Sequence, residues 1–164
     1  MIPVVLFRMF HILTAIWFVS GLIARGFALR QAAQTSDVRT VAALVQLAGR
    51  FERLMVIPGN AAVLLFGFVT AWLQGQPVFG VLQGASSNWL LVSVLLAASM
   101  VPVIPLVFIP RGKRFGAALE GALTRGQVTP ELTAAFHDRA VARAHVYELV
   151  VVGSILILMI TKPF

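Results

Sequence analysis

The chain has 164 residues, of which 59% are hydrophobic and 12% charged, against about 45–50% and about 25% in soluble domains. A soluble domain of this size could not bury so much apolar surface, and a mean hydropathy of +0.92 points to lipid as its surroundings. The chain contains no cysteine, which excludes disulfides and thiolate metal sites.

Four apolar runs are each long enough to cross a bilayer as a helix, which takes about 20 residues. In chain order they are residues 3–24, 54–74, 89–109 and 144–161. Pro102 and Pro105 interrupt the third run, so we expect an irregular turn there. Lipid offers the backbone no hydrogen-bond partner, so each run must be helical. The predicted fold is an all-α integral membrane bundle of four transmembrane helices, forming a single domain over residues 1–164.

Basic residues are divided unequally between the connections. The net charge is +7, but its positions do not suit a nucleic-acid face, since they fall in the gaps between apolar runs. Eleven lie in the first and third connections: Arg25, Arg30, Arg39, Arg50, Arg53, Arg111, Lys113, Arg114, Arg125, Arg139 and Arg143. The second connection, residues 75–88, has no charge, and only Arg8 and Lys162 remain for the other side. The positive-inside rule therefore predicts cytoplasmic first and third connections, with both termini outside.

The charged connections carry helix-start signals. Ser36 or Asp37 can cap a helix that runs into the second span. Thr129-Pro130-Glu131 combines a cap, a proline at the first helical position and an acid at the positive helix end. We expect the fourth helix to begin near Pro130 and run into its span. Residues 112–123 are expected to form a short amphipathic helix on the membrane surface.

Polar residues inside the spans are the candidates for function, because they are costly in lipid. His11, Thr14, Phe18, Gly21 and Arg25 share one face of the first helix, which should point into the bundle. His11 could be a haem or metal ligand or a proton-transfer group. Alternatively, its imidazole hydrogen-bonds a neighbouring helix. Met100 on the third helix is the candidate second haem ligand.

Polar residues in and next to the second and fourth spans predict a second polar cluster on the cytoplasmic side. Its members are Arg25, Arg53, Asn60, His145 and Glu148. Arg53, Asn60, Gly67 and Gln74 recur at steps of seven, so we expect this face to point inward, with Asn60 binding a cofactor or bridging to a backbone carbonyl. His145 and Glu148 stand at i and i+3 on one face. They could hold a proton pair, or Glu148 could pair with Arg25, Arg53 or Arg143. We predict no metal site: a di-iron centre needs carboxylates on other helices, and the spans lack them.

Short motifs in the first three spans resemble known membrane families. Phe10-His11, Trp17-Phe18 and Gly21-Leu22 look like the first helix of HemJ-type protoporphyrinogen oxidases and CopD copper-resistance membrane domains. Glu52-Arg53-Leu54 with Ile57-Pro58-Gly59 resembles the start of their second helix, and Asn88-Trp89-Leu90 that of their third. The chain also resembles the bacterial predicted integral membrane proteins of domain of unknown function 2269.

These resemblances imply a bacterial inner-membrane location, with His11 at the position of the HemJ histidine thought to bind haem b. They also imply a departure: HemJ proteins carry an essential lysine where this chain has Val92 or Ser93. The first functional hypothesis is a haem b-binding membrane protein with a redox role. The second is a non-catalytic accessory or scaffold subunit, in a homo-oligomer or a larger membrane complex. A third is a small proton- or metal-linked transporter, although no inverted repeat supports it.

Overall fold

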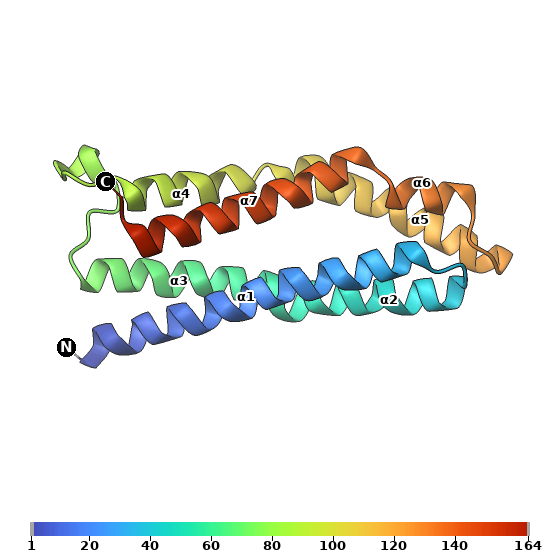
Figure 1. Ribbon diagram of the computed structural model, residues 1–164, viewed down its shortest axis with the longest axis horizontal. Helices are drawn as coiled ribbons and strands as arrows, with labels where there is room; N and C mark the ends of the chain where they lie inside the picture. The colour runs from blue at the N-terminus through green and yellow to red at the C-terminus, as the bar shows by residue number, and fades with distance from the viewer. Residues whose placement is uncertain (1, 164) are drawn as a thin grey trace. The chain divides into compact units, whose positions relative to one another are not determined.

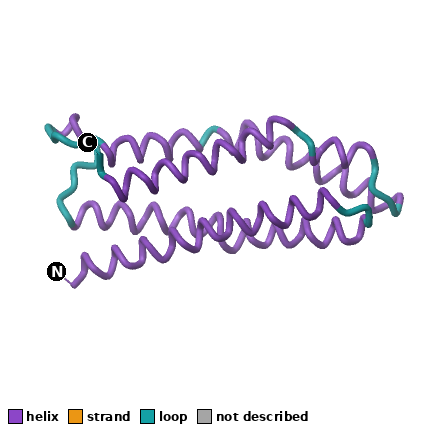
Figure 2. Tube along the Cα trace, viewed as in Figure 1, coloured by secondary structure: helices purple, strands orange, loops and turns teal. Residues whose placement is uncertain are grey.

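The computed structural model of the chain describes residues 2–163, and no β-strand occurs among them (Figures 1 and 2). The α-helices are α1 (Ile2–Gln34), α2 (Val38–Phe51), α3 (Ile57–Leu73), α4 (Trp89–Met100), α5 (Ile109–Arg125), α6 (Pro130–Phe136) and α7 (Arg139–Thr161). Two π-helical turns, η1 (Glu52–Val56) and η3 (Ile104–Phe108), and one 3-10 turn, η2 (Gly80–Gln83), lie between them.

Four helical segments are long and apolar enough to cross a membrane. They are Ile2–Gln34, Val38–Leu73, Trp89–Arg125 and Pro130–Thr161, and they contain the four predicted runs except for Gln74. Large apolar side chains such as Ile16, Leu65 and Ile157 are more than half exposed along them. Such surfaces would be unfavourable in water and are ordinary in lipid. The prediction of an all-α protein with four membrane-spanning helices is confirmed.

The chain divides into two compact units. The first runs up to Gln76 and includes Ala122–Val128, and the second comprises Pro77–Gly121 and runs on from Thr129. In the first unit α1 packs along both α2 and α3 (Figure 1). In the second, α4 packs along α7, which also contacts η3. Each unit is thus an antiparallel pair of long helical segments.

Glycines allow α1 and α3 to approach closely. A Cβ added to Gly59 on α3 would lie 3.1 Å from the Cα of Phe18 on α1, and one added to Gly21 on α1 would lie 2.6 Å from the Cβ of Met55. Small residues at helix contacts are the usual means of packing where no hydrophobic effect drives association. The polar face predicted for α1 is confirmed in position: Thr14, Gly21 and Arg25 are buried, with His11 and Phe18 half-buried.

Both π-helical turns are next to prolines. Pro58 has no N–H to donate to the carbonyl of Leu54, and its ring crowds that carbonyl. The helix widens just before it, and the N–H of Ile57 bonds to the carbonyl of Glu52, five residues back. In the third segment the helix opens at Val101–Pro102, seen as a loop in Figure 2, and the N–H of Ile109 bonds to the carbonyl of Ile104. The irregular turn predicted from the prolines is confirmed.

Side-chain oxygens close in sequence cap the connecting helices. Asp37 caps α2, accepting hydrogen bonds from the backbone N–H of Thr40 at 2.9 Å and from its hydroxyl at 2.5 Å. The Thr40 hydroxyl and then its N–H lower the pKa of Asp37. This cap therefore stabilises the helix fully above the ordinary pKa of aspartate, and its contribution is lost as pH falls through the lowered pKa. Thr129 caps α6 through its hydroxyl, which accepts from the N–H of Leu132 at 3.3 Å.

Two expectations for the connections are wrong. Residues 112–123 form no separate surface helix: they belong to α5, which continues from η3 without a break. The helix from Pro130 does not run unbroken into the fourth span. It ends at Phe136, and Asp138 starts α7 by accepting from the N–H of Ala140 at 2.8 Å. An aspartate ahead of a helical run is itself a capping signal, and it could have identified this boundary.

Candidate functional site

His11 bridges the two helices of the first unit. Its Nδ1 lies 2.9 Å from the carbonyl oxygen of Val63 on α3. Because a carbonyl only accepts, Nδ1 carries the proton and donates it. The Nε2 lone pair of the neutral ring then points away from this bond. The interhelical hydrogen bond that the sequence offered as one reading of His11 is present.

The absence of a side chain at Gly67 leaves space for the imidazole ring of His11. A Cβ at Gly67 would lie 2.9 Å from Cε1 of His11 and 3.1 Å from its Nδ1. Gly67 is one turn beyond Val63, so the imidazole lies over bare backbone while it reaches the carbonyl. Any larger residue at this position would displace the ring. The sequence placed Gly67 on an inward face, but not opposite His11.

Near His11, the hydroxyl of Thr14 is hydrogen-bonded, and phenylalanine rings of α1 and α3 contact one another. The Thr14 hydroxyl, one turn along α1, donates to the carbonyl of Phe10 at 2.7 Å and approaches that of His11 at 3.1 Å. Phe66 stacks on Phe10 with ring centroids 5.3 Å apart, and Phe7 lies 6.1 Å from Phe66.

Arg25 and Glu52 form an ion pair within the first unit. Nη1 of Arg25 lies 2.5 Å from Oε2 of Glu52, with the side chains 11% and 36% exposed. Glu52 opens the π-helical turn η1, against which Gly21 of α1 packs. Charge assistance makes such a hydrogen bond stronger than a neutral one. The sequence analysis singled out Arg25 but did not predict this partner.

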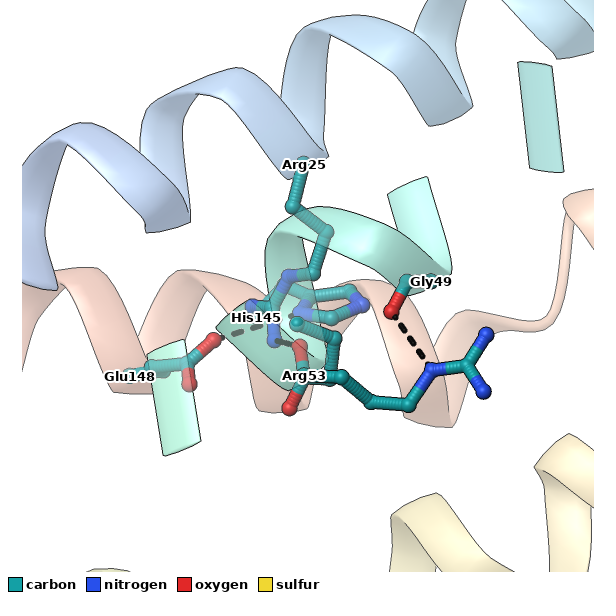
Figure 3. Close-up of polar contacts among 6 residues, drawn as sticks. Arg25, Gly49, Arg53, His145 and Glu148 are labelled. Carbon is teal, nitrogen blue, oxygen red and sulfur yellow. Dashed lines mark hydrogen bonds and ion pairs between the residues drawn. The ribbon is translucent and has the colours of Figure 1, made fainter. Parts of the chain in front are cut away.

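Three of the polar residues that the sequence predicted to face inward near the second span are exposed. Arg53 is exposed, and its Nε donates to the carbonyl of Gly49 on its own helix at 3.2 Å (Figure 3). Asn60 and Gln74 are exposed as well, so the expectation of an inward face at steps of seven is wrong for these three. The spacing assumes an unbroken α-helix, whereas Arg53 lies within the π-helical turn η1. The face of α3 that meets α1 runs instead through Gly59, Val63, Gly67 and Thr70.

His145 and Glu148 form a pair in the second unit. Nδ1 of His145 lies 3.4 Å from Oε2 of Glu148 (Figure 3), and Glu148 is 9% exposed. The Phe108 ring lies 5.0 Å from that of His145. The predicted i, i+3 contact is therefore present. Of the predicted polar cluster, Arg25, Arg53 and Asn60 belong to the first unit, and His145 and Glu148 to the second.

Several polar contacts of the second unit were not predicted. The Tyr147 hydroxyl on α7 lies 2.6 Å from the Ser99 hydroxyl on α4. Arg111 at the start of α5 donates to Asp138 at 3.0 Å, and His137 lies 2.8 Å from the carbonyl of Thr133. Met100, the proposed second haem ligand, is the last residue of α4 and is half-buried. Within residues 2–163, no three His, Asp or Glu side chains gather as a metal site.

Comparison with known proteins identifies one family. A family model described as predicted integral membrane protein, domain of unknown function 2269, matches residues 5–163. No curated protein and no solved structure matches the chain. The match covers nearly the whole sequence, including His11, and it agrees with the four membrane-spanning helices. The chain therefore belongs to the predicted integral membrane proteins of domain of unknown function 2269.

Proposed function

We propose that this integral membrane protein binds haem b through His11 and serves a redox role. The observation that supports this is the hydrogen bond from His11 Nδ1 to the Val63 carbonyl at 2.9 Å. Histidines that bind metals usually donate their second ring nitrogen to a carbonyl or carboxylate, which fixes the tautomer and orients the ring. Nε2 of His11 has the lone pair that such a ligand needs. When bound, haem iron supplies reversible one-electron transfer.

The proposal differs from HemJ chemistry in one respect. Where the HemJ family has its essential lysine, this chain has Val92 and Ser93. Ser93 is buried and its hydroxyl donates to the carbonyl of Trp89 at 2.8 Å, so it supplies no cationic group. We therefore propose haem binding and electron transfer, without protoporphyrinogen oxidation.

An absorption spectrum with three histidine variants tests the proposal. The chain has three histidines, His11, His137 and His145. Purified, haem-supplemented wild type should show a Soret band that shifts on reduction. His11→Ala should lose it, while His137→Ala and His145→Ala keep it. Gly67→Ala should also reduce bound haem, because the added methyl group displaces the His11 ring. A wild type without a Soret band, or a band that survives in His11→Ala, would contradict the proposal.

A second candidate function, as a subunit of a larger membrane assembly, is favoured by Asn60. This amide is exposed on α3, inside the second predicted span, with no hydrogen bond to the rest of residues 2–163. In hydrocarbon an amide without a partner is unfavourable, and a helix of another chain could satisfy it. Native mass spectrometry in mild detergent should then show an assembly that Asn60→Leu weakens and Leu64→Ala, one turn along, does not. A monomer in both variants and wild type would exclude this role.

A further inference from the structure

Three apolar side chains of the connection between α3 and α4 are exposed. Phe79, Val81 and Leu82 are 53%, 57% and 78% exposed. The sequence from Gly75 to Asn88 contains no charged residue. A connection facing water would be expected to show polar side chains instead. These three residues form an exposed apolar tip on the second unit.

Hydrogen bonds inside the connection hold this tip in place. The side-chain oxygen of Asn88 accepts from the N–H of Val81 at 3.0 Å, and that of Gln83 accepts from the N–H of Phe79 at 3.0 Å. Gly80, with φ of +52°, lies so close to the Asn88 side chain that no Cβ would fit. The polar side chains therefore satisfy the backbone, and the apolar ones are left outside.

The tip lies next to a marker of the membrane surface. Trp89 begins α4 directly after the connection, and Nζ of Lys162 lies 5.3 Å from the centroid of its ring. Indoles prefer the headgroup region, and lysines near helix ends extend their amines toward it. The tip therefore lies directly before a membrane-spanning segment, at the end where Trp89 and Lys162 meet.

We propose that the connection of residues 77–88 is embedded in the lipid bilayer surface, with Phe79, Val81 and Leu82 reaching the upper acyl chains. Lipid is the occupant because the tip directly precedes a membrane-spanning segment beside Trp89 and Lys162, and because it carries no charge that a polar partner could pair with. Interfacial segments are held by such buried apolar area. The inference does not depend on haem binding or on an assembly.

Nitroxide labels on single cysteines test the proposal, and the chain has no native cysteine. Leu82→Cys and Phe79→Cys are the test variants. Ser86→Cys is the matched control, since Ser86 is exposed and polar in the same connection. In liposomes containing only the full chain, labels at 79 and 82 should collide several-fold more with oxygen than with a water-soluble nickel chelate, and the label at 86 should show the reverse. Labels at 82 and 86 that are equally accessible to the chelate would show water, or a site for a protein partner, and overturn the proposal.

Discussion

Gly21→Ala is expected to destabilise the α1–α3 pair most strongly among the glycine variants, by about 3 kcal/mol, the upper end of the usual cost of overpacking. The new methyl group would lie 2.6 Å from the Cβ of Met55. That atom is fixed to the backbone of η1, so it cannot move away as the end of a flexible side chain would. The helices must separate, and contacts along their whole length weaken.

A graded series makes this expectation specific. At Gly59 the nearest atom to an added Cβ is the Cα of Phe18 at 3.1 Å, so Gly59→Ala should cost about 1 kcal/mol, the lower end of the same range. At Gly26, also on α1, nothing lies within 4 Å, so Gly26→Ala should be neutral or slightly stabilising through its helix propensity. Reversible unfolding in mixed micelles, followed by tryptophan fluorescence, measures the three values. A different order would mean that these contacts do not determine the helix packing.

The features that could be predicted from the sequence are those set by composition and by neighbouring residues. Four spans follow from runs of apolar residues, because lipid leaves only the helix to satisfy the backbone. Thr129 and the pair Ser36 or Asp37 were identified as candidate caps, and Asp37 and Thr129 do accept from N–H groups two or three residues on. The prolines likewise predicted the irregular turn at Val101–Pro102. None of these depends on how the helices cross.

The features that could not be predicted depend on which faces of the helices contact each other. Helical spacing from Arg53 pointed Asn60 inward, but Arg53 lies within the π-helical turn η1, where the spacing of a regular α-helix does not hold. His11 was identified as a polar residue in a span, whereas its bond to Val63 depends on Gly67 at the crossing of α1 and α3. Glu52 was not identified as the partner of Arg25, because the two lie 27 residues apart on segments whose approach the glycines determine.

Removing either member of the Arg25–Glu52 pair is the second change expected to have a large effect. Removing one member of a buried ion pair costs about 3–5 kcal/mol, because the contact between the two charges is lost in a region of low dielectric. Glu52 is 36% exposed, so solvent screening lowers the expected cost of Glu52→Leu and of Arg25→Leu to about 2 kcal/mol each. Arg53→Leu is the control, since exposed Arg53 bonds only a carbonyl of its own helix at 3.2 Å, and it should stay within about 0.5 kcal/mol.

The double variant separates an ion pair from two independent polar residues. Arg25→Leu with Glu52→Leu removes both charges at once, and well-packed apolar replacements of a buried pair are often neutral. The double variant should therefore lose about 1–2 kcal/mol less free energy of unfolding than the sum of the losses in the two single variants, because residues in contact are energetically coupled. Unfolding in mixed micelles at constant salt gives all four stabilities. Additive costs would show that the 2.5 Å contact contributes nothing to holding α1 against η1, and that the glycine contacts alone determine this crossing.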